Sequence, residues 1–334
     1  MPAFRQWYSV HLFRTFLALA LALSASAQPV LYACASFTRE YVVGAKLPPS
    51  GLFRRSAAGQ WVHLGFNHPF LVSLAAGPAA ALLLAAGNGL IRAPLPDGPW
   101  TVLTGEDVTE LRDVAVDRAA PDTFYFAHTR GVRVTRDGGK TWTELGAALK
   151  RKYTEAIRAD RGVLIAGGES GIFRSEDQGR TWRLAGAAGF QILRIEQSPH
   201  DACFWLAATQ QGGLFASRDC GRTFENVGRL GVDRNLYDIA FDPSDPNRIA
   251  VAGWGPGVAI SLDNGKTWRE RNAGLPSAAV TSVAFDPAHP GRLFAAAHEQ
   301  GVYVSSDSGA TWTLDGLDGA QVRRLRFIDD ASSP

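Results

Sequence analysis

Apolar and polar residues alternate along this chain in short runs that are separated by turns. One clear stretch has an apolar run over 280–286, a second over 292–297, a third over 301–304 and a fourth over 311–314. Alternation with a period of two residues in runs this short is typical of strands and not of helices. The pattern therefore predicts a unit of four strands.

The same unit recurs along the chain, and an eight-residue phrase marks the turn after the third strand. The phrase occupies 135–142, 175–182, 217–224, 261–268 and 305–312 and ends on Trp or Phe. Its aspartates lie 40, 42, 44 and 44 residues apart, at Asp137, Asp177, Asp219, Asp263 and Asp307. A strand-rich repeat of this period predicts an all-β fold, the β-propeller, in which each repeat forms one four-stranded blade.

Two weaker copies precede the five clear ones, at 51–61 and 89–100, and bring the aromatic anchors to seven. The first copy, from about Val30, has no inner strand before it, whereas the run 322–327 is an inner strand with nothing after it. The two fragments complete one blade. We therefore expect a seven-bladed β-propeller whose ring is closed by pairing of the N- and C-terminal strands, which removes exposed strand edges.

The first 27 residues have the layout of a secretory signal peptide. Arg5 and Arg14 supply positive charge, 16–23 is an apolar run, and Ala25-Ser26-Ala27 fits a cleavage site. The apolar run is shorter than the roughly 20 residues that span a bilayer, which argues against an uncleaved anchor. We expect a signal peptide over 1–27, a single propeller domain over 28–334, and export to the periplasm or the extracellular space.

Cleavage at this point would remove two of the 34 basic residues and none of the 32 acidic ones, leaving a net charge of zero. A neutral chain lacks the basic surface that nucleic-acid binding needs. No later apolar stretch is long enough to span a membrane. The expected partner is therefore neither nucleic acid nor membrane, and we expect the domain to be a monomer.

The chain has three cysteines, Cys34, Cys203 and Cys220. Cys203 opens the second strand of its repeat and Cys220 lies in the turn that ends the third, so the two residues lie at the same end of neighbouring antiparallel strands. This placement predicts a Cys203–Cys220 disulfide in an exported protein; two reduced thiols are the alternative. Residues 31–34 faintly resemble a lipoprotein box, although Tyr32 fits it poorly and the stretch also reads as a strand.

The eight-residue phrase resembles the Asp box, or BNR repeat, of sialidases, sortilin-type receptors, xyloglucan-degrading glycosidases and photosystem II assembly-factor propellers. The resemblance covers nearly all of the chain after residue 27 and is specific for architecture. It implies that the five phrase aspartates are structural and lie in a peripheral turn, away from the binding face. The overall match is best to the exported, single-domain photosystem II assembly and stability factor type, which implies binding of a protein partner.

Loops between the second and third strands, and between blades, would form the binding face at one end of the channel. They carry a mixture of aromatic, cationic and acidic side chains. The candidate ligand- or partner-binding residues are His128, Arg130, Tyr153, Glu169, Arg234, Trp254, His298 and Glu299. The first strands also carry charges that we expect to pair with one another around the channel, at Asp113, Arg158, Arg194, Glu196, Asp238, Arg324 and Arg326.

Catalytic signatures are missing from the sequence. The Arg-Ile-Pro motif of sialidases does not occur, xyloglucan-degrading enzymes use a cleft between two propellers, and the seven histidines have no metal-ligand spacing. We therefore expect no catalytic residue, metal or cofactor, and an exported propeller that binds a protein partner or a glycan. The alternative is a sialidase-like or other glycoside hydrolase, which would need two loop carboxylates, such as Glu169 and Glu299, about 5 to 10 Å apart.

Overall fold

The structure is a computed structural model and describes residues 28–37, 48–95, 98–228 and 230–329. The predicted signal peptide, 1–27, lies outside the described residues. Every regular element in the described ranges is a β-strand. The same ranges contain no helix that is long and apolar enough to cross a membrane. The alternating pattern of the sequence therefore produces strands.

The strands follow one another with short connections. In chain order they are β1 (Pro29–Ser36), β2 (Gly51–Arg55), β3 (Trp61–Leu64), β4 (Leu71–Gly77), β5 (Ala81–Ala86), β6 (Gly89–Pro94), β7 (Thr101–Val102), β8 (Leu111–Val116), β9 (Phe124–His128), β10 (Gly131–Thr135), β11 (Thr143–Glu144), β12 (Thr154–Asp160), β13 (Val163–Gly168), β14 (Gly171–Ser175), β15 (Arg183–Gly186), β16 (Ile192–Gln197), β17 (Trp205–Gly212), β18 (Leu214–Ser217), β19 (Glu225–Asn226), β20 (Val232–Phe241), β21 (Ile249–Trp254), β22 (Gly257–Ser261), β23 (Arg269–Glu270), β24 (Val280–Phe285), β25 (Leu293–Ala297), β26 (Gly301–Ser305), β27 (Thr313–Gly316) and β28 (Gln321–Asp329).

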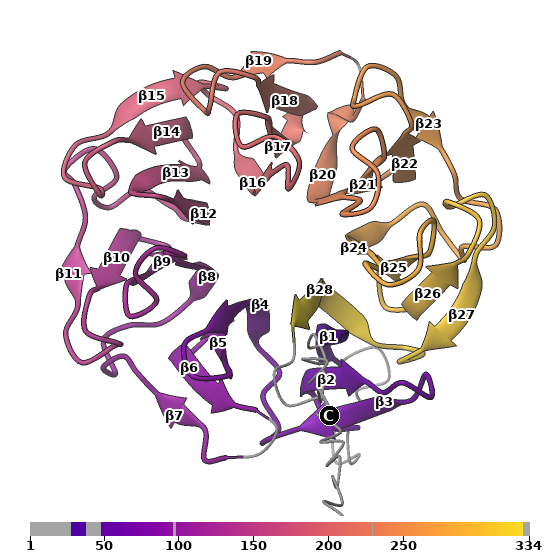
Figure 1. Ribbon diagram of the computed structural model, residues 1–334, viewed down its shortest axis with the longest axis horizontal. Helices are drawn as coiled ribbons and strands as arrows, with labels where there is room; N and C mark the ends of the chain where they lie inside the picture. The colour runs from indigo at the N-terminus through magenta and orange to yellow at the C-terminus, as the bar shows by residue number, and fades with distance from the viewer. Residues whose placement is uncertain (1–27, 38–47, 96–97, 229, 330–334) are drawn as a thin grey trace, which may run out of the picture.

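These strands form antiparallel sheets that stand around a central axis (Figure 1). Five sheets have four strands: β4–β7, β8–β11, β12–β15, β24–β27, and β28 with β1–β3. The sixth has eight strands, because β17 pairs with β20 as well as with β16 and β18. No sheet in the described ranges closes on itself.

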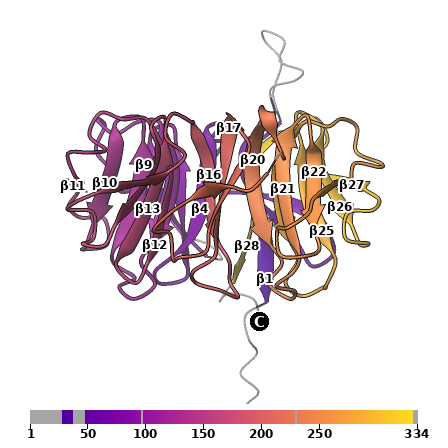
Figure 2. The same cartoon turned by 90° about the horizontal axis from the view of Figure 1, so that it is seen from above.

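The first strand of each repeat lies nearest the axis, and the fourth lies at the outside (Figure 1). From the side, the inner strands run along the axis (Figure 2). We use the name inner strands for β4, β8, β12, β16, β20, β24 and β28. Strands from the two ends of the chain meet in one sheet, where β28 pairs with β1 from Pro29 opposite Asp329 to Ser36 opposite Gln321.

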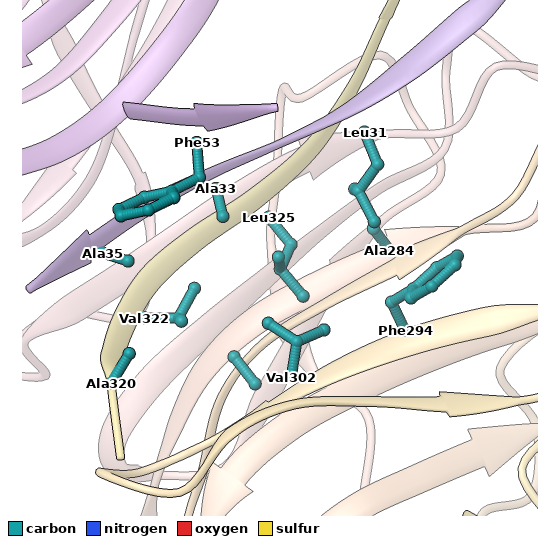
Figure 3. Packing of buried hydrophobic residues seen from close by; sticks show 11 residues of the cluster. Leu31, Ala33, Ala35, Phe53, Ala284, Phe294, Val302, Ala320, Val322 and Leu325 are labelled. Carbon is teal, nitrogen blue, oxygen red and sulfur yellow. The ribbon is translucent and has the colours of Figure 1, made fainter. Parts of the chain in front are cut away.

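The hydrophobic core lies between neighbouring sheets. Figure 3 shows one such layer, in which Leu31 and Phe53 of one sheet face Ala284, Phe294 and Val302 of the next. All five side chains are buried, with at most 7 % of their surface exposed. Burial of apolar surface between sheets stabilises the ring by about 25 cal/mol per Å².

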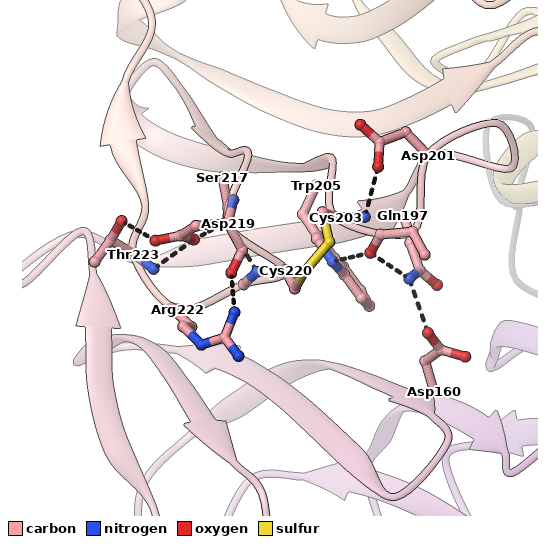
Figure 4. Close-up of a disulfide and its surroundings, with 12 residues drawn as sticks. Asp160, Gln197, Asp201, Cys203, Trp205, Ser217, Asp219, Cys220, Arg222 and Thr223 are labelled. Carbon is pink, nitrogen blue, oxygen red and sulfur yellow. Dashed lines mark hydrogen bonds between the residues drawn. A yellow bond between two sulfur atoms is a disulfide. The ribbon is translucent and has the colours of Figure 1, made fainter.

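The repeated phrase closes the turn between the third and fourth strands by local hydrogen bonds. In the copy of Figure 4, the Ser217 hydroxyl donates to Asp219 Oδ1 over 2.7 Å, and the Thr223 amide and hydroxyl donate to the same carboxylate over 2.9 and 2.6 Å. The four other copies repeat these contacts. The carboxylate satisfies turn N–H groups that would otherwise be left unpaired.

A disulfide joins Cys203 to Cys220 (Figure 4). It links the turn before β17 to the turn after β18, and the Cys220 amide also donates to the Cys203 carbonyl over 3.1 Å. Cys34 is a buried free thiol on β1, and burial raises its pKa to about 12. A thiol held in its protonated form is a poor nucleophile, so Cys34 is a core residue.

Candidate ligand-binding mouth of the channel

Each inner strand carries a β-bulge directly after its first core residue. In β8, Leu111 pairs with His128 and Asp113 with Ala127, so Arg112 has no partner residue on β9. In β28, Val322 pairs with Ala35 and Arg324 with Cys34, so Arg323 likewise has no partner residue on β1. The seven skipped residues are Val72, Arg112, Glu155, Leu193, Tyr237, Thr281 and Arg323.

All seven bulged residues line one cavity of about 510 Å³. The cavity lies at the end of the channel where the inner strands begin, and we call this end the mouth. Tyr153, Trp254 and His298 complete its rim. A bulge re-aims a side chain without breaking the sheet, so the same local distortion in seven strands turns seven side chains toward one space.

A second cavity of about 680 Å³ adjoins the first. The two share Val72, Arg112, Tyr153 and Arg323 as lining residues. The second cavity extends over β4 and β8 toward the exposed ring of Phe70, of which 59 % is accessible to solvent. Together the two cavities can hold an extended ligand and not only a single small group.

One side of the mouth is aromatic. The ring of Trp254 is 51 % exposed and lies 5.0 Å from that of His298 and 6.5 Å from that of Tyr237, measured between ring centroids. The Asn235 amide donates to the Tyr237 hydroxyl over 3.2 Å and orients that ring. A large exposed ring beside a cavity favours contact with an apolar or planar ligand group.

The other side of the mouth is charged. Arg112 donates two hydrogen bonds of 2.9 Å to Glu155, and its guanidinium lies 5.5 Å from the centre of the Tyr153 ring. Burial alone would lower the pKa of Arg112, but the Glu155 carboxylate outweighs it and raises that pKa. Burial, assisted by the charge of Glu155, raises the pKa of Tyr153 to about 12. Arg112 is thus a cation, Glu155 its anionic partner, and Tyr153 a neutral phenol.

Below the mouth, a buried cluster of ion pairs crosses the channel. Arg194 is 1 % exposed and contacts three carboxylates. Its Nη1 lies 3.4 Å from Asp113 Oδ1, and its Nε lies 3.3 Å from Asp238 Oδ1. Its Nη2 contacts the carboxylate of Glu196. The cluster also holds Arg158–Asp113 at 2.5 Å, Arg158–Glu196 at 2.8 Å, Arg324–Asp238 at 2.6 Å and Arg326–Glu196 at 2.5 Å. The predicted mutual pairing of these seven charges is confirmed.

The cations of this cluster keep Asp113 ionised. Burial alone would raise the pKa of Asp113, but Arg158 and Arg194 outweigh that effect and lower the pKa to about 2. Asp113 also accepts a 2.7 Å hydrogen bond from the Ser73 hydroxyl. Asp113 is therefore held as the anion of an ion pair and is not poised for proton transfer.

The structure brings together three of the eight predicted binding residues, Tyr153, Trp254 and His298, at the first cavity. His128 is only 5 % exposed; burial lowers its pKa to about 4, and it contacts the Phe126 ring and not the cavity. Arg130, Glu169 and Glu299 lie in turns, as predicted, whereas Arg234 lies on β20 and not in a loop; none of the four lines either mouth cavity. The loop positions in the sequence therefore locate the rim of the mouth, but not its wall.

The sequence analysis missed several wall residues: Arg112, Glu155, Gln191, Tyr237, Gln321 and Arg323. A signal for them exists, because each bulged residue directly follows the first core residue of its inner strand. When the repeats are aligned, that position holds a charged residue in three of the inner strands and a tyrosine in a fourth.

No protein-family model matches the chain, and no curated protein matches it. Solved structures do resemble it. The GH74 xyloglucanase from Xanthomonas campestris aligns with a TM-score of 0.61 at 20% identity, covering 73% of this chain and 45% of that enzyme. The chain thus spans less than half the length of that enzyme.

Two other similar structures are closer to this chain in size. YCF48 bound to D1 peptide aligns with a TM-score of 0.58 at 17% identity, covering 78% of this chain and 94% of that one. YCF48 from Cyanidioschyzon merolae aligns with a TM-score of 0.56 at 16% identity, covering 75% and 86%. The fold is a β-propeller. At these identities the likeness extends to the fold alone, and a propeller supports many unrelated functions.

Proposed function

We propose that this chain is a non-enzymatic binding propeller that recognises an extended segment of a protein partner at the mouth of its channel. The observation that carries the proposal is the ring of seven bulged residues around one cavity, with the exposed Trp254 at its rim. Rigid strands hold these side chains in place, as a preorganised binding site requires.

In this proposal the ring has seven blades and the repeated phrase is an Asp box. The eight-stranded sheet then comprises two blades, β16–β19 and β20–β23, joined by the pairing of β17 with β20. The equivalent bulge in seven inner strands supports the count, and the pairing of β28 with β1 supports closure within one blade. The repeated carboxylate contacts of the turn support the Asp-box assignment.

We also propose that the mature protein is exported and consists of one domain over 28–334. The support is the charged, apolar and small-residue sequence before Gln28 and the disulfide between Cys203 and Cys220, which suits an oxidising compartment. Mass spectrometry of the protein recovered from the periplasm would test this proposal. A chain that still begins at Met1 there would contradict it.

The wall chemistry favours a peptide over a glycan. The first cavity is lined both by apolar side chains, such as Val72 and Leu193, and by the amides of Gln191 and Gln210. Amides match the donors and acceptors of a peptide backbone, and apolar positions match its side chains. YCF48, a propeller of similar size, is described as bound to a peptide, which adds support to this interpretation.

Glycoside hydrolysis, the alternative function, receives less support from the geometry. It needs two carboxylates across the scissile bond. Of the described residues that line the first cavity, Glu155 is the only acid, and Arg112 holds it in a two-bond ion pair. The second cavity adds Glu110 at its exposed edge. Glu169 and Glu299 lie outside both cavities.

The test uses purified residues 28–334, with a phage-displayed library of random dodecapeptides and a panel of sialosides, aryl glycosides and polysaccharides. We expect enriched peptides and no sugar release. Trp254→Ala should lose peptide binding, whereas Leu314→Ala, which removes an exposed apolar side chain from the outer strand β27, should retain it. Sugar release that disappears in Glu155→Gln would establish the hydrolase instead.

A further inference from the structure

Arg323 differs from the other guanidinium groups in the walls of the mouth. Arg112 is held by Glu155 at 2.9 Å, and Arg324 is held by Asp238 at 2.6 Å. Within the described part of the chain, no carboxylate lies within 4.0 Å of the Arg323 side chain. Arg323 is a wall residue of both cavities, at the point where they adjoin.

The position of Arg323 carries an energetic penalty. Its Nε is buried and has no hydrogen-bond partner among the described residues, and its single side-chain hydrogen bond runs from Nη2 to Gln321 Oε1 over 3.3 Å. Burial, together with the like charge of Arg112, lowers the pKa of Arg323. A partly buried cation without a counter-ion destabilises the folded state, so it marks a position where a function outweighs stability.

We propose that Arg323 is the docking point for the carboxylate of an Asp or Glu side chain in the bound peptide. The inference rests on the proposed function. The planar guanidinium presents Nε and Nη donors that match the two oxygens of a carboxylate, and the bulge in β28 aims these donors into the cavity. The ligand carboxylate supplies the counter-charge that no described residue provides for Arg323.

The surroundings of Arg323 place that carboxylate within a longer ligand. Arg112, in its ion pair with Glu155, lines the same two cavities as Arg323, so the anion would lie in a space that is bordered by a second guanidinium. Phe70 and Val72 line the second cavity on one side, and Leu193 and Trp254 line the first cavity on the other. The structure therefore fits an acidic residue flanked by apolar ones.

Two matched pairs test the proposal. A peptide enriched from the phage library is synthesised as selected and with its acidic residue changed, Glu→Gln or Asp→Asn, and both forms are titrated against the wild type and Arg323→Gln. Arg269→Gln removes the same charge from an exposed position on the outer strand β23, outside both cavities, and is the control. In a separate experiment, binding of oligogalacturonate to the protein is measured. This experiment detects recognition of an acidic glycan.

We expect the peptide change to weaken binding to the wild type by about tenfold, as for a desolvated charge pair, and to have little effect on Arg323→Gln. Raising the salt concentration should weaken only the acidic form. Because no carboxylate of the described residues pairs with Arg323, Arg323→Gln should melt at the same temperature as the wild type or higher. A structural arginine would give a lower melting temperature.

The possible failures are distinguishable. The role of Arg323 would be overturned if the enriched peptides had no acidic residue. It would also be overturned if the peptide change lowered the binding affinity equally for the wild type and for Arg323→Gln. Either result would leave the binding function standing. No enriched peptide would overturn both. Retention of oligogalacturonate without any peptide would also overturn both, in favour of a glycan-binding propeller.

Discussion

Replacing Arg194 by Met should destabilise the fold strongly. The guanidinium of Arg194 is 1 % exposed and joins carboxylates from three inner strands: Asp113 of β8, Glu196 of β16 and Asp238 of β20. Methionine fills much of the same volume, so the cavity left behind is small and the effect is mainly electrostatic. Arg158, Arg324 and Arg326 remain, but none of them bridges Asp113 to Asp238.

The expected loss is about 3 to 5 kcal/mol, the cost of removing one partner from a buried ion-pair cluster. That loss is a large part of the roughly 5–15 kcal/mol by which domains are stable. The loss should also depend on pH. The lowered pKa of Asp113, about 2 against an ordinary value of 3.8, contributes stability above pH 3.8 that is lost as the pH falls toward 2. Removing Arg194 raises that pKa, so the two proteins should converge in acid.

Urea unfolding at pH 7 and at about pH 2 measures both effects, with the midpoint and slope of each transition giving the free energy of unfolding. Arg161→Met is the control, because the Arg161 side chain is 75 % exposed and pairs with Asp160 at 3.4 Å; its effect should stay within about 0.5 kcal/mol. A loss below about 1 kcal/mol for Arg194→Met at pH 7, or a loss that grows in acid, would refute the reasoning.

The remaining predictions concern His128, the disulfide and the repeated turn. Burial lowers the pKa of His128 to about 4, so its contribution to stability should be full above pH 6.5 and fall by up to about 3 kcal/mol toward pH 4. In urea unfolding, the free energy of unfolding of His128→Asn should depend less steeply on pH than that of the wild type. An equally steep dependence would count against this role of His128. Replacing Cys203 and Cys220, 17 residues apart, by Ser should cost about 3 kcal/mol in urea, and an unchanged midpoint would show that the link is not stabilising. Asp263→Ala should lower the melting temperature while peptide binding survives, because Asp263 closes a peripheral turn; loss of binding in a folded variant would refute that role.

Local features of this protein could be predicted from its sequence because their causes are local. The run over 280–286 predicts a strand by alternation, and the structure has β24 at Val280–Phe285. The phrase aspartates bind groups at most four residues away, so a short window of sequence contains the whole interaction. The inner-strand charges could be expected to pair, because unpaired charge in an interior is costly.

The composition of the mouth, by contrast, was decided by the tertiary structure. Arg112, Glu155 and Arg323 enter one cavity because a bulge re-aims each of them, and a bulge is a property of the register between two strands. The burial of His128 depends likewise on its packing against Phe126. Sequence alone determined the repeated strands and turns of this protein. Long-range register and packing decided which side chains meet, because those contacts join residues that are far apart in the chain.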